Sequence, residues 1–138
     1  MARATRKISS GKYNTRGVHT SGMYFDSKAE FDRYMQLEAM QSNGLILHLE
    51  RQPQFRFAHN GIQICRYDAD FQYMVAADSR RVVEDVKGQI LYPYKLKRKM
   101  LAAWYPDAWR DFAEIPSSKI KQWIMRIPEP GEMRPKKP

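Results

Sequence analysis

The sequence predicts a single α/β domain in which helices flank a small mixed β-sheet. The 138-residue chain has the length of one domain, and its hydrophobic content of 43% and aromatic content of 12% are typical of a globular protein. Helical and strand-like hydrophobic patterns follow one another in the order α, several β, α, β, α. This succession places strands and helices in one domain instead of separating them into two.

The two ends of the chain have the composition of flexible segments. Residues 1–22 contain no acidic residue and several basic ones, including Lys12 and Arg16. Residues 128–138 are rich in proline and lysine. We therefore predict a flexible basic arm over residues 1–22, one folded domain over residues 23–127 and a disordered tail over residues 128–138.

The first helix is predicted to follow Ser27. Ser27 and Glu30 have the S-x-x-E spacing of a capping box. Apolar residues at helical spacing come next, namely Phe31, Tyr34, Met35, Leu37 and Met40. Asn43-Gly44 should end the helix, because glycine readily adopts the left-handed conformation found at helix C-termini.

Strands are predicted on both sides of Asn60-Gly61. Residues 45–49 and 54–57 are short strand candidates separated by Pro53, which cannot donate a ladder hydrogen bond. Asn60-Gly61 is a strong hairpin-turn signal.

Two further strands, over residues 67–75 and 81–88, alternate with period two around a turn at Asp78-Ser79. Along the first, one face carries Cys65, Tyr67, Ala69, Phe71, Tyr73 and Val75, and the other carries Arg66, Asp68, Asp70 and Gln72. Along the second, one face carries Val83, Asp85 and Lys87, and the other carries Val82, Glu84 and Val86.

After Gly88 the pattern becomes helical. An imperfect apolar stripe is formed by Tyr94, Leu96, Met100, Leu101 and Trp104, and it is interleaved with Lys95, Lys97, Arg98 and Lys99. Pro106 should end this helix. A strand is then expected over residues 109–115, and a short helix after Pro116-Ser117-Ser118.

The charge balance favours a polyanionic partner. Lysine and arginine number 24 against 15 acidic residues, which gives a net charge of +9, and nucleic acid is the commonest partner of such a chain. No apolar run approaches the roughly 20 residues of a membrane span, and no signal peptide is recognisable. The single cysteine, Cys65, is expected to be reduced and buried. We therefore expect a cytoplasmic protein.

The acidic hairpin has the groups needed to cleave a phosphodiester. Asp70 and Asp85 lie on adjacent predicted strands, and Mg²⁺ or Mn²⁺ prefers such carboxylate oxygens together with water. Lys87 points to the same side as Asp85, where its ammonium can position a water or offset developing negative charge. Glu30 adds a third carboxylate if the first helix packs against the hairpin.

These segments resemble the PD-(D/E)XK, or restriction-endonuclease-like, nuclease superfamily, and most closely a small phage-encoded branch related to Holliday-junction resolvases. The resemblance covers roughly residues 23–115. It rests on the helix acid in Phe25-Asp26-Ser27-Lys28-Ala29-Glu30, on Ala69-Asp70-Phe71, and on Glu84-Asp85-Val86-Lys87-Gly88 followed by a lysine-rich helix.

The resemblance implies an α-β-β-β-α-β core and a set of roles. Asp70 corresponds to the first metal ligand, Asp85 to the second, Lys87 to the motif lysine and Glu30 to the helix acid. It implies a Mg²⁺-dependent endonuclease that acts on branched or flapped DNA in phage replication or recombination, as a homodimer in the host cytoplasm.

Several alternatives remain open at this stage. A bulge in the second strand would make Glu84 the ligand in place of Asp85. Asp70 and Lys87 have a simpler interpretation as a surface ion pair, and Glu30 as a capping residue only. Asp68 is either an accessory ligand or a solvated strand residue.

Basic residues on both sides of the acidic hairpin are interpreted as contacts to nucleic acid. The expected DNA-backbone contacts are Lys12, Arg16, Lys95, Lys97, Arg98 and Lys99. The three histidines and one cysteine have no zinc-ligand spacing. The rival functions are a non-catalytic nucleic-acid-binding module and a small basic protein that binds another protein.

Overall fold

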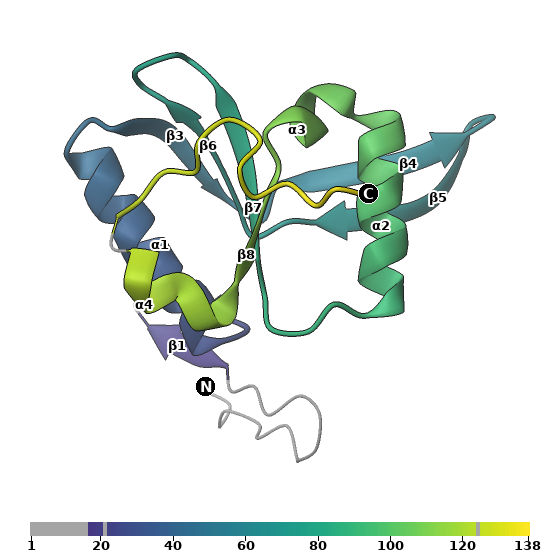
Figure 1. Ribbon diagram of the computed structural model, residues 1–138. Helices are drawn as coiled ribbons and strands as arrows, with labels where there is room; N and C mark the ends of the chain where they lie inside the picture. The colour runs from purple at the N-terminus through teal and green to yellow at the C-terminus, as the bar shows by residue number, and fades with distance from the viewer. Residues whose placement is uncertain (1–16, 21, 124) are drawn as a thin grey trace.

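The computed structural model confirms a mixed α/β fold and describes residues 17–20, 22–123 and 125–138 (Figure 1). The elements in chain order are β1 (Val18–Thr20), β2 (Met23–Phe25), α1 (Lys28–Ser42), β3 (Ile46–Arg51), β4 (Gln54–His59), β5 (Ile62–Asp68), β6 (Phe71–Val75), β7 (Arg81–Lys87), α2 (Tyr92–Trp104), α3 (Pro106–Arg110), β8 (Ala113–Pro116), a 3₁₀ turn (Ser117–Lys119) and α4 (Ile120–Trp123).

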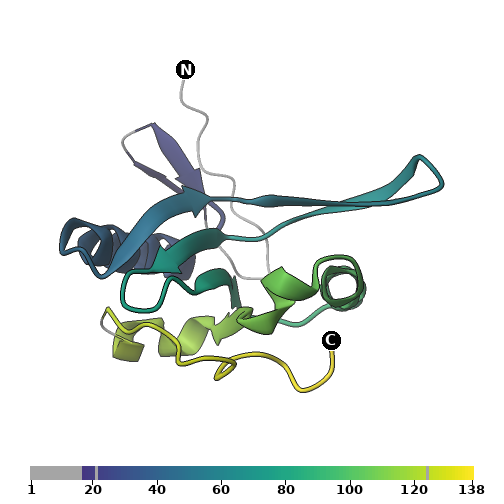
Figure 2. The same ribbon diagram turned by 90° about the horizontal axis from the view of Figure 1, so that it is seen from above.

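A four-stranded sheet in the order β3-β6-β7-β8 forms the centre of the fold. Strand β6 is antiparallel to both of its neighbours, β3 and β7, whereas β7 and β8 are parallel. The parallel pair needs a crossover, which α2 and α3 supply. Two hairpins, β1–β2 and β4–β5, stand outside this sheet, and β4–β5 projects far to one side of the molecule (Figure 2).

Strand β7 separates two apolar cores. Val82 belongs to a cluster with α1, β3, β6, β8 and α4, whereas Val83 belongs to a cluster with β4, β5, α2 and α3. Because alternate residues of a strand face opposite sides, β7 is buried on both faces. Successive side chains of β7 are therefore directed alternately toward the two sides of the sheet.

Helix α1 begins and ends as the sequence predicts. The Ser27 side chain accepts a hydrogen bond of 3.1 Å from the Glu30 N–H. At the other end Gly44, with φ of 77°, donates to the Gln41 carbonyl, and Leu45 donates to the Met40 carbonyl. These two bonds are the Schellman pattern, and they turn the chain directly into β3.

The Asn60-Gly61 turn is also confirmed. It joins β4 to β5, and both residues have positive φ, 52° and 77°. Two successive left-handed residues give a hairpin turn whose twist matches that of the flanking strands.

The strand predicted over residues 67–75 is broken in the structure. β5 ends at Asp68 and pairs with β4, whereas β6 begins at Phe71 and pairs with β3 and β7. Tyr67 and Phe71 consequently lie in different cores, although period two placed them on one face. The break is fixed by backbone bonds from Ala69 N–H to the Pro53 carbonyl and from Asp70 N–H to the Glu84 carbonyl.

The strand predicted over residues 109–115 was too long. Pro106 ends α2, as expected, but it also occupies the first position of α3, where proline is favoured. Trp109 therefore lies in a helix, and β8 begins only at Ala113. On α2, Tyr94 and Leu101 are buried, but Leu96 and Trp104 are 43% and 40% exposed, so the predicted stripe is only partly a core face.

The C-terminal segment, which its composition predicted to be disordered, instead lies along the outside of β8 (Figure 1). The Glu114 N–H donates to the Met133 carbonyl at 3.1 Å, and the Arg80 guanidinium donates to the Pro128 carbonyl at 3.1 Å. Met133 also packs against the core on the α1 side.

A buried ion pair ties α1 to the sheet. Arg33 and Glu84 are both fully buried, and the guanidinium meets the carboxylate in a fork with distances of 2.8 and 2.7 Å. The Tyr73 hydroxyl donates to the same carboxylate at 2.5 Å. Breaking such a pair leaves an uncompensated charge in a low-dielectric interior.

Arg33→Met should therefore destabilise the protein by about 3–5 kcal/mol, because it leaves Glu84 buried without its cation. Urea unfolding followed by circular dichroism measures the effect. The double variant Arg33→Met with Glu84→Gln should recover a substantial part of the loss. Equal destabilisation in the single and double variants would show that the charge on Glu84 is not the cause.

Candidate metal-binding and catalytic site

The structure brings the four predicted catalytic residues to one place. Asp70 lies at the junction between β5 and β6, Asp85 and Lys87 lie on β7, and Glu30 lies in the first turn of α1. The charges of Asp85 and Glu30 both act on Asp70. Two strands and a helix terminus thus converge on a common group of carboxylates.

Asp70 and Asp85 form the centre of the site. The Val86 N–H donates to Asp70 Oδ2 at 2.7 Å, and the two aspartate side chains hydrogen-bond to each other. Burial, followed by the charges of Asp85 and Glu30, raises the pKa of Asp70 well above its usual value. Burial also raises the pKa of Asp85, but Lys87 and the hydrogen bonds from its neighbours oppose this rise. The pKa of Asp70 is therefore raised by its surroundings with little opposition, whereas that of Asp85 is raised by burial and lowered by its neighbours.

Lys87 is the cation of the site. Its Nζ lies 3.3 Å from Asp85 Oδ1, and it stands 4.3 Å above the centre of the Tyr94 ring. The side chain is 27% exposed, so one side of the ammonium remains accessible to a ligand. The ring and the carboxylate together fix its position.

Tyr67 is a site residue that the sequence analysis missed. Its hydroxyl donates a hydrogen bond to Asp85 Oδ2. Burial, followed by the charge of Asp85, raises the pKa of Tyr67, so the phenol stays protonated and remains a donor. Tyr67 was assigned to an apolar face, but a buried tyrosine hydroxyl normally needs a polar partner, and this requirement was the available signal.

Glu30 is buried with incomplete hydrogen bonding. It is 3% exposed, and Oε1 accepts from the Asp26 N–H at 3.3 Å, one residue before the capping-box position. The Oε2 atom is buried and has no hydrogen-bond partner in the part of the chain that the structure describes. Burial, followed by the charge of Asp26, raises the pKa of Glu30 to about 7. Its capping role accounts for only one of its two oxygens.

Glu84 and Asp68, the alternative ligands, both have other partners in the structure. Glu84 is held by Arg33 on the opposite face of β7, so Asp85 and not Glu84 faces Asp70. Asp68 is exposed and pairs with Arg66 at 2.9 Å. Lys87 pairs with Asp85 and not with Asp70.

The carboxylate oxygens of Asp70, Asp85 and Glu30 are the ligand type that a hard divalent cation prefers. The charges of Asp85 and Glu30 both act on Asp70, and within the described ranges one Glu30 oxygen is buried without a hydrogen-bond partner. In the described part of the chain no set of three or more His, Cys, Asp or Glu side chains is arranged to hold a metal ion. Mg²⁺ is commonly bound through only one or two carboxylates with several waters, and Asp70 and Asp85 are such a pair.

The predicted DNA contacts fall into three groups. Lys95 and Lys99 are exposed on α2, and Lys97 is partly buried there. Arg98 instead forms an ion pair of 2.6 Å with Glu114 and is largely buried, which withdraws it from the surface. Lys12 and Arg16 lie outside the described residues.

The metal-free protein should lose stability as the pH rises. The pKa of Glu30 is about 7 in the folded state against 4.5 for the free side chain, so its contribution is complete below about pH 4.5 and is lost as the pH passes 7. Glu30→Gln should therefore lose less stability than the parent between pH 5 and pH 8. The difference should be on the order of 2–3 kcal/mol, since one pKa unit corresponds to about 1.4 kcal/mol.

Urea unfolding in EDTA at the two pH values measures this difference. Glu50→Gln, an exposed change on β3, is the matched control and should follow the parent. A parallel pH dependence of Glu30→Gln and the parent would contradict the assignment.

Comparison with known proteins places the chain in a family. No curated protein and no solved structure matches it. Among the described residues no helix is both long and apolar enough to cross a membrane. Residues 10–121, most of the chain, match the family model DUF1064, which is described as a protein of unknown function. Since the match spans the site and nearly the whole fold, the chain belongs to the DUF1064 family.

Proposed function

We propose that the protein is a Mg²⁺- or Mn²⁺-dependent DNA endonuclease of the PD-(D/E)XK type. The observation that carries the proposal is the convergence of Asp70, Asp85 and Lys87 beside the buried Glu30. Such a group, with several perturbed pKa values and a specific charge partner, is more typical of a functional site than of a structural one.

The arrangement of elements supports the same proposal. With the β4–β5 hairpin set aside, α1, β3, β6, β7, α2 and β8 follow the order α-β-β-β-α-β that the resemblance implies. Asp85 lies on the central strand β7, and Asp70 immediately precedes β6, the strand that pairs with β7. We propose on this basis that the sheet and its helices form a restriction-endonuclease-like core.

Each residue has a distinct role in the proposed reaction. Asp70 and Asp85 hold the cation, which when bound supplies an acidified water and neutralises phosphate charge. The water oxygen would form a bond to phosphorus as one bridging P–O bond breaks, and the leaving alkoxide would take a proton from solvent water, which yields a phosphomonoester and an alcohol. Lys87 Nζ orients the attacking water or the phosphate oxygen. Glu30 accepts the proton that the water loses, and a pKa of about 7 suits this role.

DNA is the proposed substrate because of the charge of the chain. The net charge is +9, and the exposed lysines of α2 lie on the helix that follows the site. Branched or flapped DNA is the substrate class that the resemblance favours.

Plasmid nicking in Mg²⁺, Mn²⁺ or EDTA tests the proposal. The parent should cleave only with metal, and Asp70→Asn or Lys87→Met should each lower the rate by at least about 100-fold, as for other groups that act on the transition state. Asp78→Asn in the β6–β7 turn and Lys136→Met in the C-terminal segment are charge-matched controls and should cleave like the parent.

The other outcomes distinguish the rival functions. Salt-sensitive binding to plasmid, flap or four-way junction without cleavage would replace the enzyme with a nucleic-acid-binding module. Cleavage that survives Asp70→Asn would also overturn the assignment of the site.

A further inference from the structure

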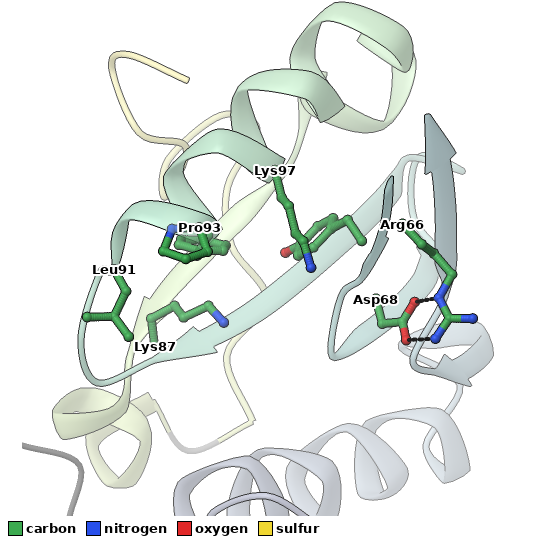
Figure 3. A pocket seen from close by; sticks show the side chains of 8 residues that line it. Arg66, Asp68, Lys87, Leu91, Pro93 and Lys97 are labelled. Carbon is green, nitrogen blue, oxygen red and sulfur yellow. Dashed lines mark hydrogen bonds and ion pairs between the residues drawn. The ribbon is translucent and has the colours of Figure 1, made fainter. Parts of the chain in front are cut away.

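A pocket of about 400 Å³ opens beside the catalytic lysine (Figure 3). It lies between β5, the end of β7 and the first turns of α2. Its walls include Arg66, Asp68, Lys87, Leu91, Pro93 and Lys97. Lys87 therefore belongs both to the carboxylate group and to this pocket.

The pocket has an excess of positive charge. Figure 3 shows the amino groups of Lys87 and Lys97 extending into the same space. Among the described residues Lys97 has neither a hydrogen bond nor an ion pair, although it is partly buried. The one acid of the pocket, Asp68, is already neutralised by Arg66 through two contacts of 2.9 and 3.0 Å. An anion in this space could contact Lys97 together with the exposed side of Lys87, whose other side meets Asp85 at 3.3 Å.

The remaining wall is apolar. Leu91 and Pro93 stand at the start of α2 and are exposed to the pocket, with Leu91 38% exposed. The first turn of α2 has neither a side-chain cap nor an acidic residue, so nothing in that turn competes with an anionic ligand. A pocket with a cationic side and an apolar side suits a ligand with a phosphate and a ring.

We propose that this pocket binds the nucleotide next to the scissile phosphodiester, a proposal that rests on the proposed nuclease function. The phosphate of this nucleotide lies between Lys97 and Lys87, and its sugar and base lie against Leu91 and Pro93. The volume suits one nucleotide and is within the range of small-molecule pockets.

The pocket also indicates a substrate class. A base seated against Leu91 and Pro93 has left the base stack, and removing a paired base from a duplex costs a few kcal/mol. A base that is already unpaired avoids this cost. The protein should therefore prefer DNA that is single-stranded next to the cut, such as a flap or a frayed end.

A binding experiment in EDTA tests the pocket independently of cleavage. Thymidine 5′-monophosphate, inorganic phosphate and thymidine are titrated separately and followed by NMR. The monophosphate should bind most tightly, and Lys97→Met should weaken its binding about 10-fold or more, since hydrogen bonds to charged groups are worth about 1.5–3 kcal/mol. Lys136→Met should bind like the parent.

The outcomes separate this proposal from the nuclease assignment. Monophosphate binding that depends on Lys97, in a protein that does not cleave DNA, supports the pocket and overturns the nuclease. Metal-dependent cleavage without monophosphate binding supports the nuclease and overturns the proposed pocket. Inorganic phosphate that binds as tightly as the monophosphate would overturn the nucleotide assignment.

Cleavage kinetics test the substrate class. Lys97→Met should raise KM for a flap or a single strand with little change in kcat, and should reduce the preference over blunt duplex. Because no hydrogen bond or ion pair is recorded for Lys97 within the described ranges, and methionine keeps most of its apolar stem, the melting temperature of the variant should match that of the parent. An equal loss on flap and duplex would show that Lys97 is a general backbone contact, and would overturn the proposed preference.

Discussion

Two adjacent buried carboxylates on β7 impose the main electrostatic constraint on this fold. Glu84 and Asp85 are almost completely buried, and strand geometry directs them to opposite faces. Each face must therefore compensate its own negative charge. On one face Arg33 and Tyr73 satisfy Glu84 completely. On the other, Asp85 meets further acids, Lys87 and Tyr67.

The two faces of β7 differ in how completely their buried carboxylates are paired. The Glu84 side has a fork of hydrogen bonds and is closed to solvent. The Asp85 side has one lysine against three acids, an oxygen of Glu30 without a partner, and an adjoining pocket. Unsatisfied negative charge of this kind is costly in a folded protein unless a ligand compensates it. The same strand thus anchors α1 through Glu84 and contributes Asp85 to the proposed site.

Much of the fold and the site followed from local patterns in the sequence. The capping box at Ser27, the Asn60-Gly61 turn and the alternation along β7 each depend on neighbouring residues, and each is found in the structure. The grouping of Asp70 with Asp85 followed from pairing adjacent strands. Periodicity, however, reports which face a side chain occupies and not which sheet its strand joins. For this reason the break between β5 and β6, near Tyr67 and Asp70, could not be predicted from periodicity.

The residues that were missed depend on long-range contacts. Arg33 lies 51 positions from Glu84, and nothing near it in the sequence indicates that partner. Tyr67 was classified by its ring, whereas its hydroxyl determines its role at Asp85. Composition predicted a disordered tail, whereas in the structure the segment contacts residues distant in the sequence, with Glu114 donating to the Met133 carbonyl and Arg80 to the Pro128 carbonyl.

That C-terminal segment has a consequence for self-association. β8 is the last strand of the central sheet, and an uncovered outer strand is a template on which another chain can add a strand. The bond between Glu114 and Met133 occupies part of this row of donors and acceptors. The chain thereby covers part of one flank of its own sheet, which leaves fewer backbone groups there for intermolecular β-pairing.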